Sequence, residues 1–297
     1  MNKPQSKLEV WILASRPKTL PAAASPVLVG SALAFYVGKF QLFPAIAALL
    51  AALLLQVGAN LANDLFDFHK GADAGERLGP TRVTQAGLLS PKHVERGMWV
   101  IFGLAALLGV YLIWVAGLPV VLIGLASILA ALAYTGGPFP FGYYGLGDLF
   151  VFIFFGLAAV CGTFYVQTGF LNWLVVWSSI PMGFLITAIL VVNNLRDIHS
   201  DRLAGKKTLA VRLGAKGARW EFLFCLIAAW SLPLGLWLTG LLSAWIMISW
   251  GTIVVAIPLV QQVWNWTGRP LNKTLAGTGR LTLVYAILFS IGVLLSV

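Results

Sequence analysis

Two short clusters of acidic and amide side chains stand out in a chain that is apolar along most of its length. They occupy residues 63–73 and 193–201, and each contains the pattern Asn-x-x-x-Asp. Each cluster follows directly on a long apolar run. Carboxylates beside such a run are costly unless they bind something, so we expect the chemistry of the protein at these two places.

The spacing within each cluster suits a hard divalent cation. If a helix runs through the first cluster, Asn63 and Asp67 lie one turn apart on one face. A helix through the second cluster would align Asn193, Asp197 and Asp201 in the same way. Aligned oxygen side chains form one wall of a magnesium site, and Mg²⁺ held by carboxylates usually also contacts the phosphates of a substrate.

Basic side chains alternate with these carboxylates in both loops. They are Lys70, Arg77, Arg82, Arg196, Lys206 and Lys207. Asp73 is expected on a loop, from which it could fold back as a further ligand. A complex of diphosphate with Mg²⁺ needs both kinds of charge, because the metal neutralises some oxygens while arginine and lysine hold the rest. The simpler alternative, solvated loop charge, is favoured for Lys92, Arg212, Lys216 and Arg219.

The composition is that of an integral membrane protein. Of the 297 residues, 59% are hydrophobic and 10% are charged, whereas about a quarter of a soluble domain is charged. No polar block is long enough for a separate soluble domain, so we expect residues 1–297 to form one membrane domain. The formal net charge of +10 fits basic loops beside a membrane, and we expect no nucleic-acid partner.

The apolar runs predict an all-α protein embedded in lipid, because they show none of the alternation of a barrel strand. About nine of them approach the 20 residues that a span needs. They are 18–38, 42–63, 97–116, 118–135, 148–167, 172–194, 219–239, 242–263 and 276–296. The first is interpreted as a retained helix because no cleavage site interrupts it.

The distribution of charge predicts an orientation. Of the 20 lysines and arginines, all except Lys39 fall on one side of the predicted spans, and the acidic residues fall on that side too. By the positive-inside rule this side is cytoplasmic. We therefore expect a multi-pass protein of the cell inner (plasma) membrane, with its N-terminus and its active site on the cytoplasmic face.

The two clusters also suggest an internal repeat. The first ends the second predicted span and the second ends the sixth, so two four-helix units plus a ninth helix would bring them face to face across a central cavity. A diphosphate at the mouth and a long hydrocarbon chain inside would suit that cavity. Aromatic side chains near it are expected to stabilise an allylic cation through their π-faces, or simply to pack. They are Tyr134, Phe139, Tyr143, Tyr144, Phe152 and Tyr165.

These residues resemble the UbiA superfamily of intramembrane aromatic prenyltransferases, which carries two motifs of the form NxxxDxxxD. The second cluster matches fully, whereas the first has Gly71 at the third acidic position and Asp73 two residues later. Further strings resemble the branch that uses 1,4-dihydroxy-2-naphthoate, and the match covers nearly the whole chain. These strings are 16–22, 60–64, 66–73, 79–83, 134–138, 145–148, 193–197 and 206–214.

The resemblance implies a reaction and a set of roles. A polyprenyl diphosphate ionises with the help of Mg²⁺, and the naphthoate ring attacks at the carbon whose carboxylate leaves as CO₂, giving demethylmenaquinol for menaquinone. The metal ligands would be Asp67, Asp73, Asp197 and Asp201. Substrate contacts would come from Asn63, Lys70, Arg82, Tyr134, Tyr143, Asn193, Arg196 and Lys206. Asp148 would activate a ring hydroxyl, or would only complement the dipole at a helix start.

Three other functions fit part of the pattern. A sister prenyltransferase would share the metal site and use another acceptor, such as 4-hydroxybenzoate. A cation-coupled transporter would place its acidic residues near the middle of the membrane. A polyprenyl-diphosphate phosphatase would need a nucleophile or base at the metals, and His69 and His199 are interpreted as outer or solvated residues.

Overall fold

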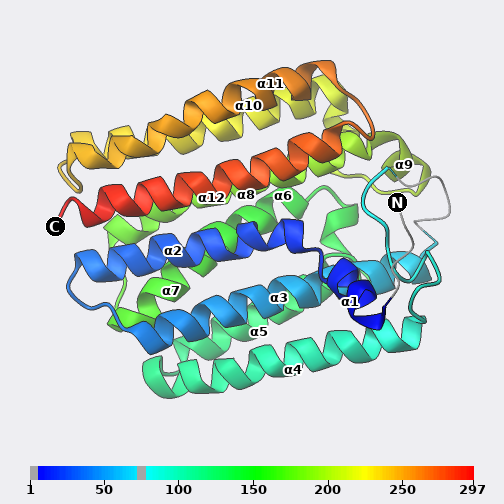
Figure 1. The fold of residues 1–297 in the computed structure, drawn as a ribbon, viewed down its shortest axis with the longest axis horizontal. Coiled ribbons are helices and arrows are strands. Elements are labelled where there is room, and N and C mark those ends of the chain that lie inside the picture. Colours follow the sequence, from blue (N-terminus) through cyan, green and yellow to red (C-terminus); the bar gives the residue numbers. More distant parts are fainter. Residues whose placement is uncertain (1–5, 72–77) are drawn as a thin grey trace.

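The computed structural model describes residues 6–71 and 78–297, and all regular elements in these ranges are helices (Figure 1). In chain order they are α1 (Lys7–Ser15), η1 (Pro17–Thr19), α2 (Leu20–Tyr36), α3 (Leu42–His69), α4 (Pro91–Ala116), α5 (Pro119–Ala133), η2 (Phe141–Tyr143), α6 (Gly147–Val151), η3 (Phe152–Ala158), α7 (Ala159–Thr168), α8 (Trp173–Arg196), α9 (Ile198–Leu203), α10 (Leu209–Leu238), η4 (Ala244–Thr252), α11 (Ile253–Asn265) and α12 (Leu271–Leu294). The all-α membrane class is therefore confirmed.

Eight helical stretches in the described part of the chain are long and apolar enough to cross a bilayer. They account for eight of the expected spans. The remaining span, expected at 118–135, forms the 15-residue helix α5, which is shorter than the roughly 17–25 residues of a usual span. The first span begins earlier than expected, because α1, η1 and α2 together run from Lys7 to Tyr36.

Local sequence explains where the helices stop and how closely they pack. Gly169 adopts a left-handed conformation, with φ of 78°, at the end of α7. The side chain of Asn172 then accepts a hydrogen bond from the Val175 amide, at 3.0 Å, and caps α8. Where η3 crosses α8, a Cβ added to Gly156 would lie 2.6 Å from the Cα of Gly183. Two glycines thus let these backbones meet, as small residues do in membrane bundles.

One half of the bundle is densely buried, whereas the opposite half buries fewer side chains. The main core gathers around α8, which packs against α10, α12 and η3. Helices α3, α4 and α5 lie along the opposite side of the bundle (Figure 1), and fewer of their side chains are buried. A cavity of about 1500 Å³ lies between these parts and is lined from α2, α3, α4, α5, η3, α7 and α8. The expected central cavity is therefore present.

The two acidic clusters end their helices differently. Helix α3 runs through the first cluster to His69, as expected. Helix α8 stops at Arg196, Asp197 has φ −96° and ψ 8°, and α9 starts at Ile198. The expectation of one helix through the second cluster is therefore wrong. Adjacent side chains diverge on a helix, so the ion pair between Arg196 and Asp197 is easier to form at a turn.

Candidate active site

Both clusters open onto one end of the cavity. Asn63 and Asp67 contribute from the end of α3, while Asn193, Asp197 and Asp201 contribute from α8, the turn after it and α9. The structure thus brings together five oxygen-bearing side chains from two clusters that are far apart in the sequence. Deeper in the cavity the lining is mostly aliphatic. It includes Val27, Ala48, Ala52, Leu112, Val120 and Gly124.

Asp67 is the centre of the first cluster and is only 1% exposed. Its carboxylate forms an ion pair with Arg82 and accepts a hydrogen bond from Lys206 Nζ at 3.0 Å. The hydroxyl of Tyr143 donates to its other oxygen at 2.5 Å. Three separate chain segments therefore converge on one carboxylate. Such charge-assisted bonds offset the cost of burying it.

Tyr143 also contacts two ammonium groups. The Nζ atoms of Lys70 and Lys206 lie 4.6 Å and 4.7 Å from the centre of its ring, within range of a cation–π interaction. Lys70 Nζ donates to the backbone oxygen of Thr135 at 2.6 Å. Burial lowers the pKa of the Lys70 amine and repulsion from Lys206 adds to this effect, while Asp67 opposes it.

Asn63 and Asp64 make contacts in different directions, and each of them holds a neighbouring loop. The Asn63 amide oxygen accepts from the Thr135 hydroxyl at 2.9 Å, and its backbone oxygen accepts from Arg82 Nη1 at 3.1 Å. Asp64 is 3% exposed, and one of its oxygens accepts from the backbone amide of Val83 at 2.9 Å. Asp64 thus anchors the segment 78–90, which carries Arg82.

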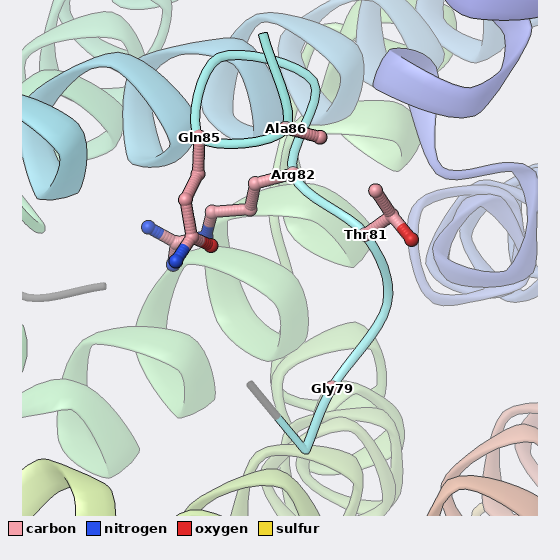
Figure 2. A pocket seen from close by; sticks show the side chains of 5 residues that line it. All are labelled: Gly79, Thr81, Arg82, Gln85 and Ala86. Carbon is pink, nitrogen blue, oxygen red and sulfur yellow. The ribbon is translucent and has the colours of Figure 1, made fainter. Parts of the chain in front are cut away.

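Figure 2 shows how segment 78–90 presents its side chains around a second, smaller cavity of about 250 Å³. The side chains of Arg82 and Gln85 extend to the same side of the segment, and Thr81 points away from them. Gly79 precedes Thr81 on the same segment and lies apart from the other labelled residues. Because Arg82 lines both cavities, a shift of this segment would move a cation of the main site.

Arg196 organises the second cluster. Its Nε donates to Asp197 Oδ1 at 2.8 Å, and its Nη2 pairs with the other oxygen of the same carboxylate. Nη2 also donates to the Asn193 amide oxygen, and Nη1 to the Asn272 amide oxygen, each at 2.8 Å. Asp201 lines the same mouth. Burial raises the pKa of its carboxyl to about 7; Lys206 opposes this, and repulsion from Asp197 and Asp67 adds to it.

The donor set at the mouth fits magnesium only when a ligand completes it. Among residues 6–71 and 78–297, no three Asp, Glu, His or Cys side chains lie close enough to hold a metal by themselves. Mg²⁺ commonly takes one or two carboxylates and fills its other positions with water and phosphate oxygens. Asp67, Asp197 and Asp201 around one opening meet that need. Asp73 lies outside the described residues.

Several expected site residues lie elsewhere. Asp148 was expected on a loop but sits in the first turn of α6, is 7% exposed, and is not among the described residues that line the cavity. Phe139 and Tyr144 stack on each other, with ring centres 4.2 Å apart, and are exposed. Phe152 packs against Phe184 at 4.9 Å. These three residues follow the packing alternative, and none of them is among the described residues that line the cavity.

Other aromatic side chains take their place. Tyr134 and Tyr143 line the cavity as expected, together with four phenylalanines that the sequence did not single out. These are Phe141, Phe150, Phe154 and Phe155. Phe141 and Phe150 stack with ring centres 3.9 Å apart. Three of the four fall within the stretch from α6 into η3, where the helical repeat changes, so a regular helical pattern could not identify the inward face.

Comparisons with known proteins agree with this geometry. The model of the family described as UbiA prenyltransferase family matches residues 23–284. The 1,4-dihydroxy-2-naphthoate octaprenyltransferase of Escherichia coli is 38% identical, with 98% of this chain and 97% of that protein covered. The protein of the same name from Bacillus subtilis is 34% identical, with 97% and 92% covered.

Solved structures share the fold at lower identity. A UbiA homolog from Aeropyrum pernix superposes with a TM-score of 0.71 at 19% identity and covers 94% of this chain and 98% of its own. A UbiA homolog from Archaeoglobus fulgidus, bound to DMAPP and Mg²⁺, gives a TM-score of 0.66 at 15% identity, with 97% and 99% covered. At such identities the likeness establishes the arrangement of helices.

Proposed function

The chain belongs to the UbiA prenyltransferase family, and we propose that it transfers a polyprenyl group from polyprenyl diphosphate to 1,4-dihydroxy-2-naphthoate. The products are demethylmenaquinol, CO₂ and diphosphate, which makes the reaction a step of menaquinone synthesis. One observation carries the proposal: acidic and basic side chains from both clusters surround the mouth of a long apolar cavity. Relatives named 1,4-dihydroxy-2-naphthoate octaprenyltransferase, at 34–38% identity over nearly the whole chain, support the choice of acceptor.

The shape of the cavity suits a diphosphate with a long hydrocarbon tail. Asp67 and Ala48 both line it, and both lie on α3. With a helical rise of about 1.5 Å per residue, they are roughly 28 Å apart along the axis. The polar end would hold the diphosphate, and the apolar end would take several isoprene units out of contact with water.

The residues at the mouth divide into two groups by charge. Asp67, Asp197 and Asp201 would hold Mg²⁺, together with Asp73, which is outside the described residues. Bound there, Mg²⁺ supplies positive charge that makes diphosphate a better leaving group. Lys206, Arg82 and the other cations at the mouth would pair with the remaining phosphate oxygens. The others are Lys70 and Arg196, and the amides of Asn63 and Asn193 add polar contacts.

The proposed reaction balances without an external base. The carbon–oxygen bond of the prenyl diphosphate breaks, and its electron pair leaves with diphosphate. The ring carbon that bears the carboxylate uses its π electrons to bond the allylic carbon. The bond to the carboxylate then breaks, its electrons restore the aromatic ring, and CO₂ leaves. The ring face of Tyr134 at the mouth would favour the positive charge that develops on the allylic carbon. The ring of Tyr143 already contacts the ammonium groups of Lys70 and Lys206.

Asp148 would act less directly than the carboxylates at the mouth. The segment that carries it contacts the cavity wall, because a Cβ added to Gly147 would lie 3.0 Å from the Tyr134 hydroxyl. Thr187 Oγ1 donates to the backbone oxygen of Asp148 at 3.4 Å. We propose that any influence of Asp148 on a ring hydroxyl passes through Tyr134.

The chain is a multi-pass membrane protein, and we propose that it lies in the inner (plasma) membrane as one functional domain with its mouth toward the cytoplasm. The charge distribution supports this orientation, because Arg82 and Lys206 line the mouth and Lys70 contacts Tyr143 beside it, while Lys39 lies in the turn between α2 and α3. The acidic residues of the two clusters that the structure describes lie at or just beyond the ends of α3 and α8. A transporter would place them near the membrane midplane.

An acceptor assay tests the proposal. Purified protein is incubated with Mg²⁺ and a radiolabelled polyprenyl diphosphate, with either 1,4-dihydroxy-2-naphthoate or 4-hydroxybenzoate. We expect labelled product with the naphthoate. Product with the benzoate alone would retain the family and replace the acceptor. Release of inorganic phosphate without transfer to either acceptor would instead indicate a phosphatase.

A further inference from the structure

Three distant chain segments meet at the guanidinium of Arg196. They are the end of α8, the first turn of α12 and the start of segment 78–90. Arg196 is only 2% exposed, and its hydrogen bonds to Asp197, Asn193 and Asn272 satisfy most of its donors. An arginine so enclosed fixes the geometry of its partners, because its planar fork leaves little freedom.

Asn272 joins two of these segments through the two ends of its amide. Its oxygen accepts from Arg196 Nη1 at 2.8 Å, and its nitrogen donates to the backbone oxygen of Leu78 at 2.7 Å. A donor and an acceptor are both needed here, and an amide side chain provides both. Leu78 belongs to the segment that follows the first acidic cluster, whereas Arg196 belongs to the second cluster.

Gly79 supplies the third contact. A Cβ added to Gly79 would lie 2.7 Å from Nη2 and 3.0 Å from Cζ of Arg196. The guanidinium therefore lies directly against the backbone of Gly79, and a side chain there would displace it. Three residues later, Arg82 reaches Asp67. The segment is held at Leu78 by Asn272 and at Val83 by Asp64, so Arg82 lies between two fixed points.

We propose that Asn272 is a positioning residue that couples the two acidic clusters. It holds Arg196 on Asp197, and it holds segment 78–90 so that Arg82 stays on Asp67. Asn272 lines the cavity, but both ends of its amide are engaged by protein groups, so it acts through Arg196 and the segment. The proposal rests on the proposed function in one respect: it takes both clusters to bind one magnesium–diphosphate group.

The two ends of the amide can be separated by substitution. Asn272→Ala removes both contacts, whereas Asn272→Asp keeps an acceptor for Arg196 and loses the donor to Leu78. Gly79→Ala leaves Asn272 unchanged and places a methyl group against the guanidinium of Arg196. Asn265→Ala and Gly103→Ala are matched controls, because Asn265 is exposed at the end of α11 and a Cβ on Gly103 meets open space.

The test measures binding of a non-hydrolysable probe, geranylgeranyl thiolodiphosphate, with Mg²⁺ to the full chain in detergent. We expect Asn272→Ala and Gly79→Ala to weaken binding by about 10- to 100-fold, as loss of outer-shell partners does at metal sites, and Asn272→Asp to weaken it less. In turnover, KM for the prenyl diphosphate should rise by a similar factor while KM for the acceptor stays unchanged. A merely structural defect would not separate the two constants.

The outcomes are distinct. Binding of the probe by Asn272→Ala and Gly79→Ala as tight as by the two controls would overturn the coupling. If Asn272→Ala does not remain folded, Asn272→Asp and Gly79→Ala decide the matter in the same way. Failure of the proposed function would appear elsewhere, as wild-type protein that binds the probe but prenylates no aromatic acceptor.

Discussion

Asp67 and Asp201 line the same mouth, yet replacing each by asparagine should change stability in opposite directions. Asp67 is almost fully buried and carries contacts from Arg82, Lys206 and Tyr143. Asp67→Asn keeps the shape and removes the charge, which leaves two cations beside a neutral amide. Removing one member of a buried ion pair costs about 3–5 kcal/mol, which corresponds to a fall in unfolding temperature on the order of 10 °C.

The surroundings of Asp201 disfavour its charge on balance. Its side chain makes no hydrogen bond within the described part of the chain. Burial raises the pKa of its carboxyl and repulsion from Asp197 and Asp67 adds to this, whereas Lys206 and Arg196 oppose it. Asp201→Asn removes a buried charge whose cost these cations do not fully offset, so the unfolding temperature should stay the same or rise. Turnover should nevertheless fall by at least about 100-fold in both variants, because each loses a proposed metal ligand.

The assay follows tryptophan fluorescence during heating in detergent, for which the 12 tryptophans provide signal, and measures product formation on the same preparations. Wild-type protein and Asn265→Ala are the controls. Equal losses of stability in Asp67→Asn and Asp201→Asn would refute the assignment of opposite electrostatic surroundings. Normal turnover in either variant would refute its assignment as a metal ligand.

Three further outcomes follow from the geometry of the cavity. Tyr143→Phe removes the hydroxyl that donates to Asp67 and keeps the ring, so kcat should fall by about tenfold, measured under saturating substrates. Gly124 lines the cavity with open space beyond its Cα, so Gly124→Phe should shorten the longest prenyl diphosphate that is used; comparing chain lengths in competition measures this. Chelation of divalent cations should abolish transfer and added Mg²⁺ should restore it, without loss of fold as followed by circular dichroism.

The long apolar runs were sufficient to predict the class, the membrane spans and the position of both acidic clusters at helix ends. The exceptions depend on tertiary contacts. Helix α5 is shorter than its apolar run because the chain turns at Tyr134, whose backbone oxygen accepts from Gly142 at 2.9 Å. The break after Arg196 accompanies its ion pair with the next residue, and hydrophobic periodicity carries no signal of that pairing.

The site was predictable where its residues occur in local motifs and unpredictable where they do not. Asp67 and Asp197 are recognisable because charged groups are rare in apolar runs. No such signal identifies Asn272, since polar residues are common in the first turn of a helix. Only the fold brings it to Arg196 and Leu78. Gly79 belongs to a recognisable string, but its contact with Arg196 is likewise visible only in three dimensions.

The most direct test of the proposed reaction uses 1,4-dihydroxy-2-naphthoate labelled in its carboxyl group, with Mg²⁺, a polyprenyl diphosphate and the purified protein. Labelled CO₂ and prenylated naphthoquinol are quantified together. We predict that they form in equal amounts and at equal rates, and that Asp67→Asn forms neither. Prenylated product that retains the label, or release of CO₂ without prenyl transfer, would contradict bond formation at the carbon that bears the carboxylate.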